Sequence, residues 1–233
     1  MNIVLNRKGI VKFLIIIALL LIFIHTVILC IYYYVGDPDK FDYVRMFDLD
    51  MERNVPTLFS SLIFAISSFL FYLLIKLPKE QKNGSRRYWL GLSFVFIFLS
   101  FDETAVIHEQ IGDYTEQFVD ANGFLHYPWV ISYSILVLIL AAVYLRFFLK
   151  MERKIFWSFV AAAVIFLTGA LGFDILGANE SSLHGTATVT YSVLYTIEES
   201  LEMFGVIYLI HILLGLLDQS NAKIVKETDE STQ

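Results

Sequence analysis

Two clusters of ionisable residues lie inside long apolar stretches of this 233-residue chain. The first occupies residues 102–109 (DETAVIHE) and the second occupies residues 198–202 (EESLE), while a further acid, Asp174, follows another apolar stretch. Carboxylates combined with imidazole suit Zn, Mn or Fe, whereas carboxylates alone suit Ca or Mg. The pattern therefore predicts a site for a divalent metal ion. Its expected ligands are Asp102, His108, Asp174, Glu198 and Glu202.

Two neighbouring acids, Glu103 and Glu199, are the candidate catalytic residues. A metal ion activates a bound water, and a carboxylate that is not a ligand then serves as its general base. The leading prediction is thus a metal-dependent hydrolase acting on a lipid-like or periplasm-facing substrate. Two alternatives stay open. One is a proton- or cation-coupled transporter or channel that uses the same acids, and the other is a non-catalytic membrane subunit whose acids pair with a partner's basic helix.

No basic residue accompanies these acids, because Lys and Arg occur within the apolar stretches only near one end. Insertion scales assign about 2.5–3.5 kcal/mol to an ionised residue at the centre of a membrane-spanning helix. Two forms of compensation remain. Either some carboxyl groups are protonated, since burial and mutual repulsion disfavour the charged form, or a bound cation neutralises them.

Six apolar segments must position these residues. The chain is 57% hydrophobic and only 17% charged, which is too little charge to cover a soluble domain of this size. A bilayer core of about 30 Å needs roughly 20 apolar residues in a helix. The sequence therefore predicts an all-α polytopic membrane protein, a bundle of six transmembrane helices. They are expected at about 13–35, 57–77, 89–109, 129–149, 155–177 and 191–217.

The distribution of basic residues predicts the orientation. Of the 17 Lys and Arg residues, only Lys40, Arg45 and Arg53 fall in segments on the side opposite the N-terminus. The positive-inside rule then predicts that both termini lie in the cytoplasm. The expected location is the inner or plasma membrane of the cell. Residues 218–233 are expected to form a polar, disordered cytoplasmic tail. Membrane lipids are the expected partners, a homo-oligomer stays open, and the lack of a basic stripe on a soluble fold argues against nucleic-acid binding.

This topology brings the acids to one depth in the outer half of the bilayer, because the third predicted helix runs outward and the sixth runs inward. In a regular helix Glu198 and Glu202 share a face. Glu103 and His108 point away from the Asp102 face unless a local bulge turns them inward.

Three stretches carry a resemblance to a known group of proteins. Asp-Glu-x4-His-Glu at 102–109, His-Tyr-Pro-Trp at 126–129 and Glu-Glu-x2-Glu-Met-x-Gly at 198–205 resemble those of uncharacterised bacterial multi-pass membrane proteins. The resemblance covers about the third to sixth helices and implies no known activity or cofactor. The His-Glu-x-x-His motif of zincins and the Glu-x-x-His pairs of di-iron bundles are absent. The sequence leaves open whether His25, His126 or His184 joins the site.

Overall fold

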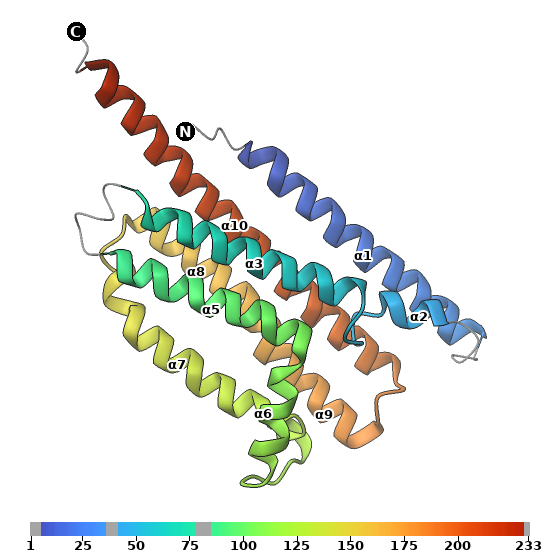
Figure 1. Cartoon of the computed structure of the whole chain (residues 1–233). Helices are drawn as coiled ribbons and strands as arrows, with labels where there is room; N and C mark the ends of the chain where they lie inside the picture. The colour runs from blue at the N-terminus through green and yellow to red at the C-terminus, as the bar shows by residue number, and fades with distance from the viewer. Residues whose placement is uncertain (1–5, 36–41, 78–84, 231–233) are drawn as a thin grey trace.

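The computed structural model describes residues 6–35, 42–77 and 85–230, and over these residues the chain is all-helical, without a strand (Figure 1). This confirms the all-α fold class. Five helices are long and apolar enough to cross a membrane, and a sixth crossing is formed if one sharply bent helix pair counts as a single span. The chain is therefore a multi-pass helical bundle of the membrane type.

The long helices follow one another along the bundle in up-and-down order (Figure 1). The bent pair consists of α5 (Arg86–Ala105) and α6 (Ile107–Glu116), whose axes differ by 80°. The other long elements are α1 (Arg7–Val35), α3 (Val55–Ile75), α7 (Trp129–Phe148), α8 (Arg153–Leu167), the π-helix η3 (Thr168–Phe173), α9 (Asp174–His184) and α10 (Val189–Glu230). Two short elements, α2 (Asp42–Phe47) and the 3-10 turn η2 (Gly123–Leu125), lie in the connections.

Helix α10 forms the centre of the bundle and packs against α1, α3, α8, η3 and α9. Its apolar residues Met203, Ile210 and Leu213 have no exposed surface. Burial of a side chain of this kind stabilises the fold by about 1.5–3 kcal/mol. On α10 the hydrophobic core therefore extends over residues 203–217, on the far side of Glu202 from the start of the helix.

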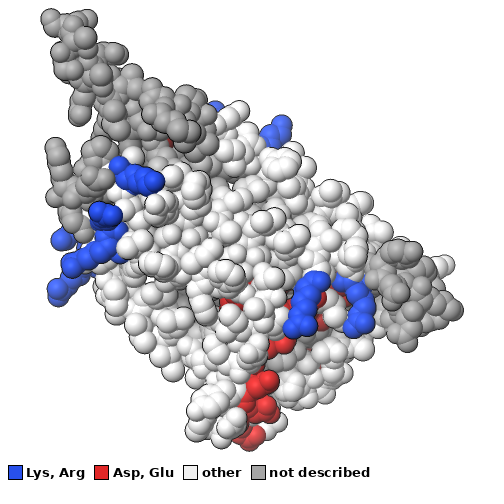
Figure 2. Space-filling view, in the orientation of Figure 1, with Lys and Arg blue, Asp and Glu red and all other residues white. Residues whose placement is uncertain are grey.

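The two ends of the bundle differ in charge. Figure 2 shows blue side chains around one end, which we call the basic end, where α1 and α5 begin and the turn joins α7 to α8. Red side chains gather at the opposite, acidic end, where α6 lies and where Arg45 and Arg53 are also found. The start of α1 and the C-terminal part of α10 both lie at the basic end (Figure 1). Cytoplasmic termini stay a prediction, since the fold by itself does not set the direction of the bundle in a membrane.

Three predicted segments differ from the helices of the structure. The segment 89–109 divides at Val106, so that α5 ends at Ala105 and α6 turns aside. The segment 155–177 continues through η3 and α9 to His184. The last helix continues to Glu230, across most of the segment predicted to be a disordered tail, and residues 231–233 lie outside the described residues.

The π-helix η3 brings α8 and α9 close to α10. A π-turn widens the helix by one residue and turns the residues that follow it, and here it ends immediately before Asp174. Gly169 makes the close approach feasible, because a Cβ atom there would lie 2.6 Å from the carbonyl oxygen of Glu198 and 3.1 Å from Cβ of Leu201. Gly172, in the same π-helix, has nothing closer to such a Cβ than 3.8 Å.

We expect Gly169→Ala to lower the free energy of unfolding by about 1–3 kcal/mol, because the added methyl group overpacks a contact with rigid backbone. Gly172→Ala is the matched control, with an expected change within about 0.5 kcal/mol. Thermal unfolding of the detergent-purified variants, followed by far-UV circular dichroism, measures both. Equal melting temperatures for the two variants would contradict the close η3–α10 packing.

Candidate functional site

A cavity of about 700 Å³ lies toward the acidic end, lined by the loop before α3 and by α3, α5, α6, α7, α8, η3, α9 and α10. All seven residues predicted for the site line this cavity. Within the described residues its wall contains no Lys or Arg, whereas nine acidic residues and one histidine line it. These ten are Asp50, Glu52, Asp102, Glu103, His108, Glu109, Asp174, Glu198, Glu199 and Glu202.

The break between α5 and α6 turns His108 toward the cavity. Val106 adopts the left-handed conformation with φ of 59°, which costs a β-branched residue on the order of 1 kcal/mol or more. A hydrogen bond at the first turn of α6 partly offsets this cost, because the backbone N–H of His108 donates to Oδ1 of Asp102 at 2.7 Å. A regular helix would have pointed His108 away from Asp102; the bend brings the two together.

His108 joins the end of α5 to the loop before α3. Its Nδ1 atom lies 3.4 Å from Oδ1 of Asp102, and its Nε2 atom lies 3.3 Å from Oε1 of Glu52. The other oxygen of Asp102 accepts a hydrogen bond of 2.8 Å from the Tyr133 hydroxyl on α7. Asp102, which is 5% exposed, therefore has both oxygens engaged and holds the imidazole in place.

The loop between α2 and α3 supplies two acids that are not among the predicted site residues. Asp50 and Glu52 both line the cavity, and the Tyr191 hydroxyl on α10 donates to Oδ1 of Asp50 at 2.8 Å. Asp48, Asp50 and Glu52 alternate, so the two cavity acids are two residues apart in an irregular segment that ends at the Asn54 cap of α3. The sequence signal for these two acids was the alternation of acidic residues directly before the capping Asn and the Pro at the start of α3.

Asp50 lies outside the membrane-spanning helices and is exposed at the cavity mouth. The surrounding protein nevertheless desolvates its carboxyl group, which raises the pKa of Asp50 to about 6; the Tyr191 hydrogen bond lowers it, and nearby Asp48 raises it further. The carboxyl group is thus mostly neutral below about pH 6 and negative above it. The charge at the mouth therefore changes in the mildly acidic range.

Two buried carboxylate oxygens of the cavity wall have no hydrogen-bond partner within the described residues, namely Oδ2 of Asp174 and Oε2 of Glu52. Asp174 is 6% exposed and stands at the first position of α9. Buried polar atoms are hydrogen-bonded in the great majority of native structures. Each of these two oxygens is therefore free to accept a hydrogen bond or to contact a cation.

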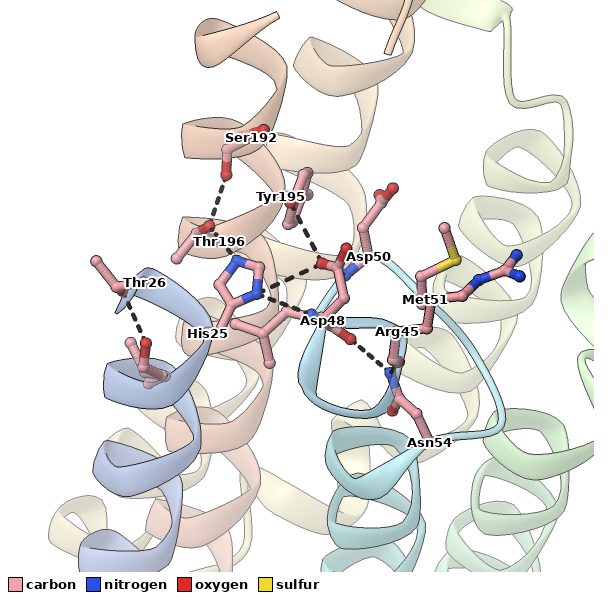
Figure 3. A network of polar contacts seen from close by, with 12 residues as sticks. His25, Thr26, Arg45, Asp48, Asp50, Met51, Asn54, Ser192, Tyr195 and Thr196 are labelled. Atoms are coloured by element: carbon pink, nitrogen blue, oxygen red, sulfur yellow. Dashed lines mark hydrogen bonds and ion pairs between the residues drawn. The ribbon is translucent and has the colours of Figure 1, made fainter. Parts of the chain in front are cut away.

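His25 is not part of the cavity but fixes the loop that carries Asp50 and Glu52. Figure 3 shows its ring between α10 and this loop. The backbone N–H of Leu49 donates to Nδ1 at 3.2 Å, which leaves the proton on Nε2, 3.1 Å from the Thr196 hydroxyl oxygen. Oδ1 of Asp48 lies 3.4 Å from the same Nδ1 and accepts from the Tyr195 hydroxyl at 3.3 Å. Both ring nitrogens are occupied, which assigns His25 a structural role.

The remaining histidines that the sequence left open lie away from the cavity. His126 contacts the Tyr127 ring next to it, with centroids 5.2 Å apart. His184 is 61% exposed in its side chain, and its Nδ1 lies 3.2 Å from Glu180 on the same helix. Neither residue lines the cavity wall.

Carboxylates and an imidazole are suitable ligand types for a hard or borderline cation, but the described side chains do not converge on one point. In the described part of the chain no three His, Cys, Asp or Glu side chains converge closely enough to enclose a metal ion. Asp102 supports Nδ1 of His108 in the way that a carboxylate commonly supports a metal-bound histidine. Glu52 lies beside Nε2, the nitrogen through which a histidine supported in this way binds a metal.

One comparison with known proteins gives a match. A family model described as a domain of unknown function (DUF8692) matches residues 13–216. No curated protein and no solved structure matches the chain. The matched range begins within α1 and ends within α10, and so includes every residue of the cavity wall. The chain therefore belongs to the DUF8692 family.

Proposed function

We propose that this membrane protein binds a divalent metal ion, Zn, Mn or Fe, in the carboxylate cavity and uses it for hydrolysis. The observation that carries the proposal is the composition of the wall, which holds nine acids and no Lys or Arg in the described residues. Moving carboxylates out of water without partners is costly, and a divalent cation among them offsets that cost.

The candidate roles follow from position. His108 is held by Asp102 and has Glu52 beside its second nitrogen, which makes His108 and Glu52 a first pair of ligands. Asp174 offers an oxygen that has no other partner. Glu198 and Glu202 complete the proposed set from α10, one turn apart. Asp102 moves in this proposal from ligand to the group that orients the histidine.

Glu103 and Glu199 are proposed to handle protons. Both line the cavity from different helices, α5 and α10. A carboxylate in hydrogen-bond reach of a metal-activated water accepts its proton and later returns it to the leaving group. In hydrolysis of an ester- or amide-type bond, the water would supply both the attacking oxygen and the proton that the leaving group receives.

A transport function finds less support, because it needs a polar route to the basic end. Beyond Glu202 the fully buried Met203 and Ile210 fill the bundle. Ser67 bonds the carbonyl of Ile63 in its own helix, and Ser68 pairs with Ser93 on α5, so these hydroxyls are engaged in packing. The described residues thus offer no polar route from the cavity to the basic end.

Elemental analysis of protein purified without chelators tests the proposal. We expect close to one Zn, Mn or Fe per chain, directly or after reconstitution, and at least a tenfold loss of affinity in the double variant Asp174→Asn/Glu202→Gln. The matched control is Asp113→Asn/Glu116→Gln, which removes the same charge from exposed positions of α6 outside the cavity. Equal metal content in both double variants, or no metal in any sample after reconstitution, would overturn the metal site.

A further inference from the structure

The cavity continues from its carboxylate end into an apolar limb along α5. Four side chains of α5 line this limb within about two helical turns of Asp102: Phe94, Val95, Phe98 and Leu99. The eight residues from Phe94 to Asp102 correspond to about 12 Å along a helix. The cavity is thus amphipathic along its length, with acids at one end and only hydrocarbon side chains at the other.

Helix α7 forms the opposite wall of the limb. Leu136, Val137 and Leu140 follow Tyr133 at helical spacing and line the same space. Phe166 of α8 and Ala170 of η3 close the back of the limb. Every one of these side chains is apolar, so the limb offers no hydrogen-bond partner to a polar solute.

The ring and polar contacts between the two walls lie at the ends of the limb. At the basic end the ring of Tyr88 stacks on Phe147 with centroids 4.7 Å apart, and Tyr144 packs against Gly91. At the acidic end the hydrogen bond joins Tyr133 to Asp102. Between these levels the two helices run side by side in Figure 1 but do not belong to the closely packed helix pairs of the described residues. The cavity lies between them there, lined by Phe98 and Val137 among others, and this part of the interface forms a window.

The exposure of the lining residues shows which way the window faces. Phe94 is 65% exposed, Leu136 is 40% exposed and Phe98 is 37% exposed, although all three line the cavity. On the side of the cavity that faces the bundle core, Phe64 of α3 is only 4% exposed. The cavity is therefore open between α5 and α7 and closed toward the core. In a spanning bundle the open side faces the acyl chains of the bilayer.

We propose that a membrane amphiphile enters through this window and lays one acyl chain in the apolar limb. Its oxygen-bearing headgroup then lies at the carboxylate end, beside the bound cation; this last step rests on the proposed function. Two properties of the window select this occupant. A polar solute gains nothing from an entrance surrounded by hydrocarbon, whereas an acyl chain exchanges one apolar environment for another and carries its headgroup to the polar end. The substrate class is thus an acyl lipid with ester or amide oxygens.

Photocrosslinking in vesicles of phosphatidylcholine tests the inference, with a small fraction of the lipid carrying a diazirine on one acyl chain. We expect crosslinks to peptides from the limb, notably around Phe98 and Ala170, in addition to the lipid-facing surface. Val137→Trp fills the limb and should reduce the limb crosslinks about fivefold or more. Leu138→Trp is the matched control, because Leu138 is 69% exposed and does not line the cavity. Ala170→Leu provides a second, smaller block.

Crosslinks confined to outward-facing residues, or limb crosslinks unchanged by both blocking variants, would overturn the lipid site. Metal content measured on the same samples separates this result from a failure of the proposed function. Limb crosslinks without metal in any sample would leave the lipid site standing and remove the cation. Metal retained in Val137→Trp while limb crosslinks are lost would support both, since that substitution leaves every cavity carboxylate in place.

Discussion

Replacing Glu202 by glutamine is expected to make the metal-free protein more stable while it abolishes tight divalent-cation binding. Glu202 is half-buried in the cavity wall with Asp174, Glu198 and Glu199, and no Lys or Arg of the described chain lines that wall. An ionised acid at a helix centre costs about 2.5–3.5 kcal/mol on insertion scales, so we expect a gain of about 1–3 kcal/mol at pH 8. Thermal unfolding in detergent with excess chelator measures the gain.

Two further measurements sharpen this expectation. At pH 5 the gain should shrink, because a protonated glutamate and a glutamine carry the same charge. With saturating metal the order should reverse, since a cation that binds only the folded state stabilises it and the variant has lost a ligand. Glu116→Gln, at an exposed position on α6 outside the cavity, should show neither effect. A Glu202→Gln protein less stable than wild type in chelator would contradict the idea that the acids repel one another in the empty cavity.

His25→Ala is expected to give the largest loss of stability, on the order of 3–4 kcal/mol. The His25 side chain has no exposed surface, and its removal leaves a cavity and strips partners from the Leu49 amide and the Thr196 hydroxyl (Figure 3). Thermal unfolding measures the global loss. Hydrogen exchange at the Leu49 amide measures the local loss, and we expect that amide to exchange at least tenfold faster.

The neighbouring residue offers a control for His25. The Thr26 side chain is exposed, and its hydroxyl donates only to the carbonyl of Ile22 in its own helix. Thr26→Ala should change stability by less than about 0.5 kcal/mol and leave the Leu49 amide protected. A His25→Ala protein with unchanged exchange at Leu49 would show that the loop keeps its place by other contacts, such as the Asn54 side-chain amide, which donates to the Asp48 carbonyl oxygen at 2.6 Å.

The sequence predicted that the acids lie close together, because hydropathy and helix direction are long-range regularities; their depth in a bilayer stays a prediction. Apolar length places a helix in the bilayer, and alternating direction then places Asp102 and Glu202 in the same layer. These two residues line one cavity, as do the other five predicted residues. Their roles as ligands and catalytic groups stay predictions.

The local geometry could not be predicted from the same regularities. A valine in the left-handed conformation is rare and has no composition signal, so the bend at Val106 was beyond a reading based on helical periodicity. The sequence analysis named two alternatives for His108, a regular helix or a local bulge. The structure has neither of these but an 80° bend between two helices. The entry of Asp50 and Glu52 into the cavity depends on how the loop folds back over the bundle, which hydropathy does not describe.

The absence of a polar route from the cavity to the basic end, over the described residues, has an electrical consequence for the proposed metal site. A divalent ion bound near Glu202 would meet the buried apolar side chains of Met203 and Ile210 beyond it, and it would leave by the route through which it entered. Moving one elementary charge through a whole membrane potential of 100 mV changes its energy by about 2.3 kcal/mol. An ion that travels only part of that distance feels a proportional part of the field, doubled by its two charges. Occupancy of the site would therefore follow the membrane voltage while no steady current flows.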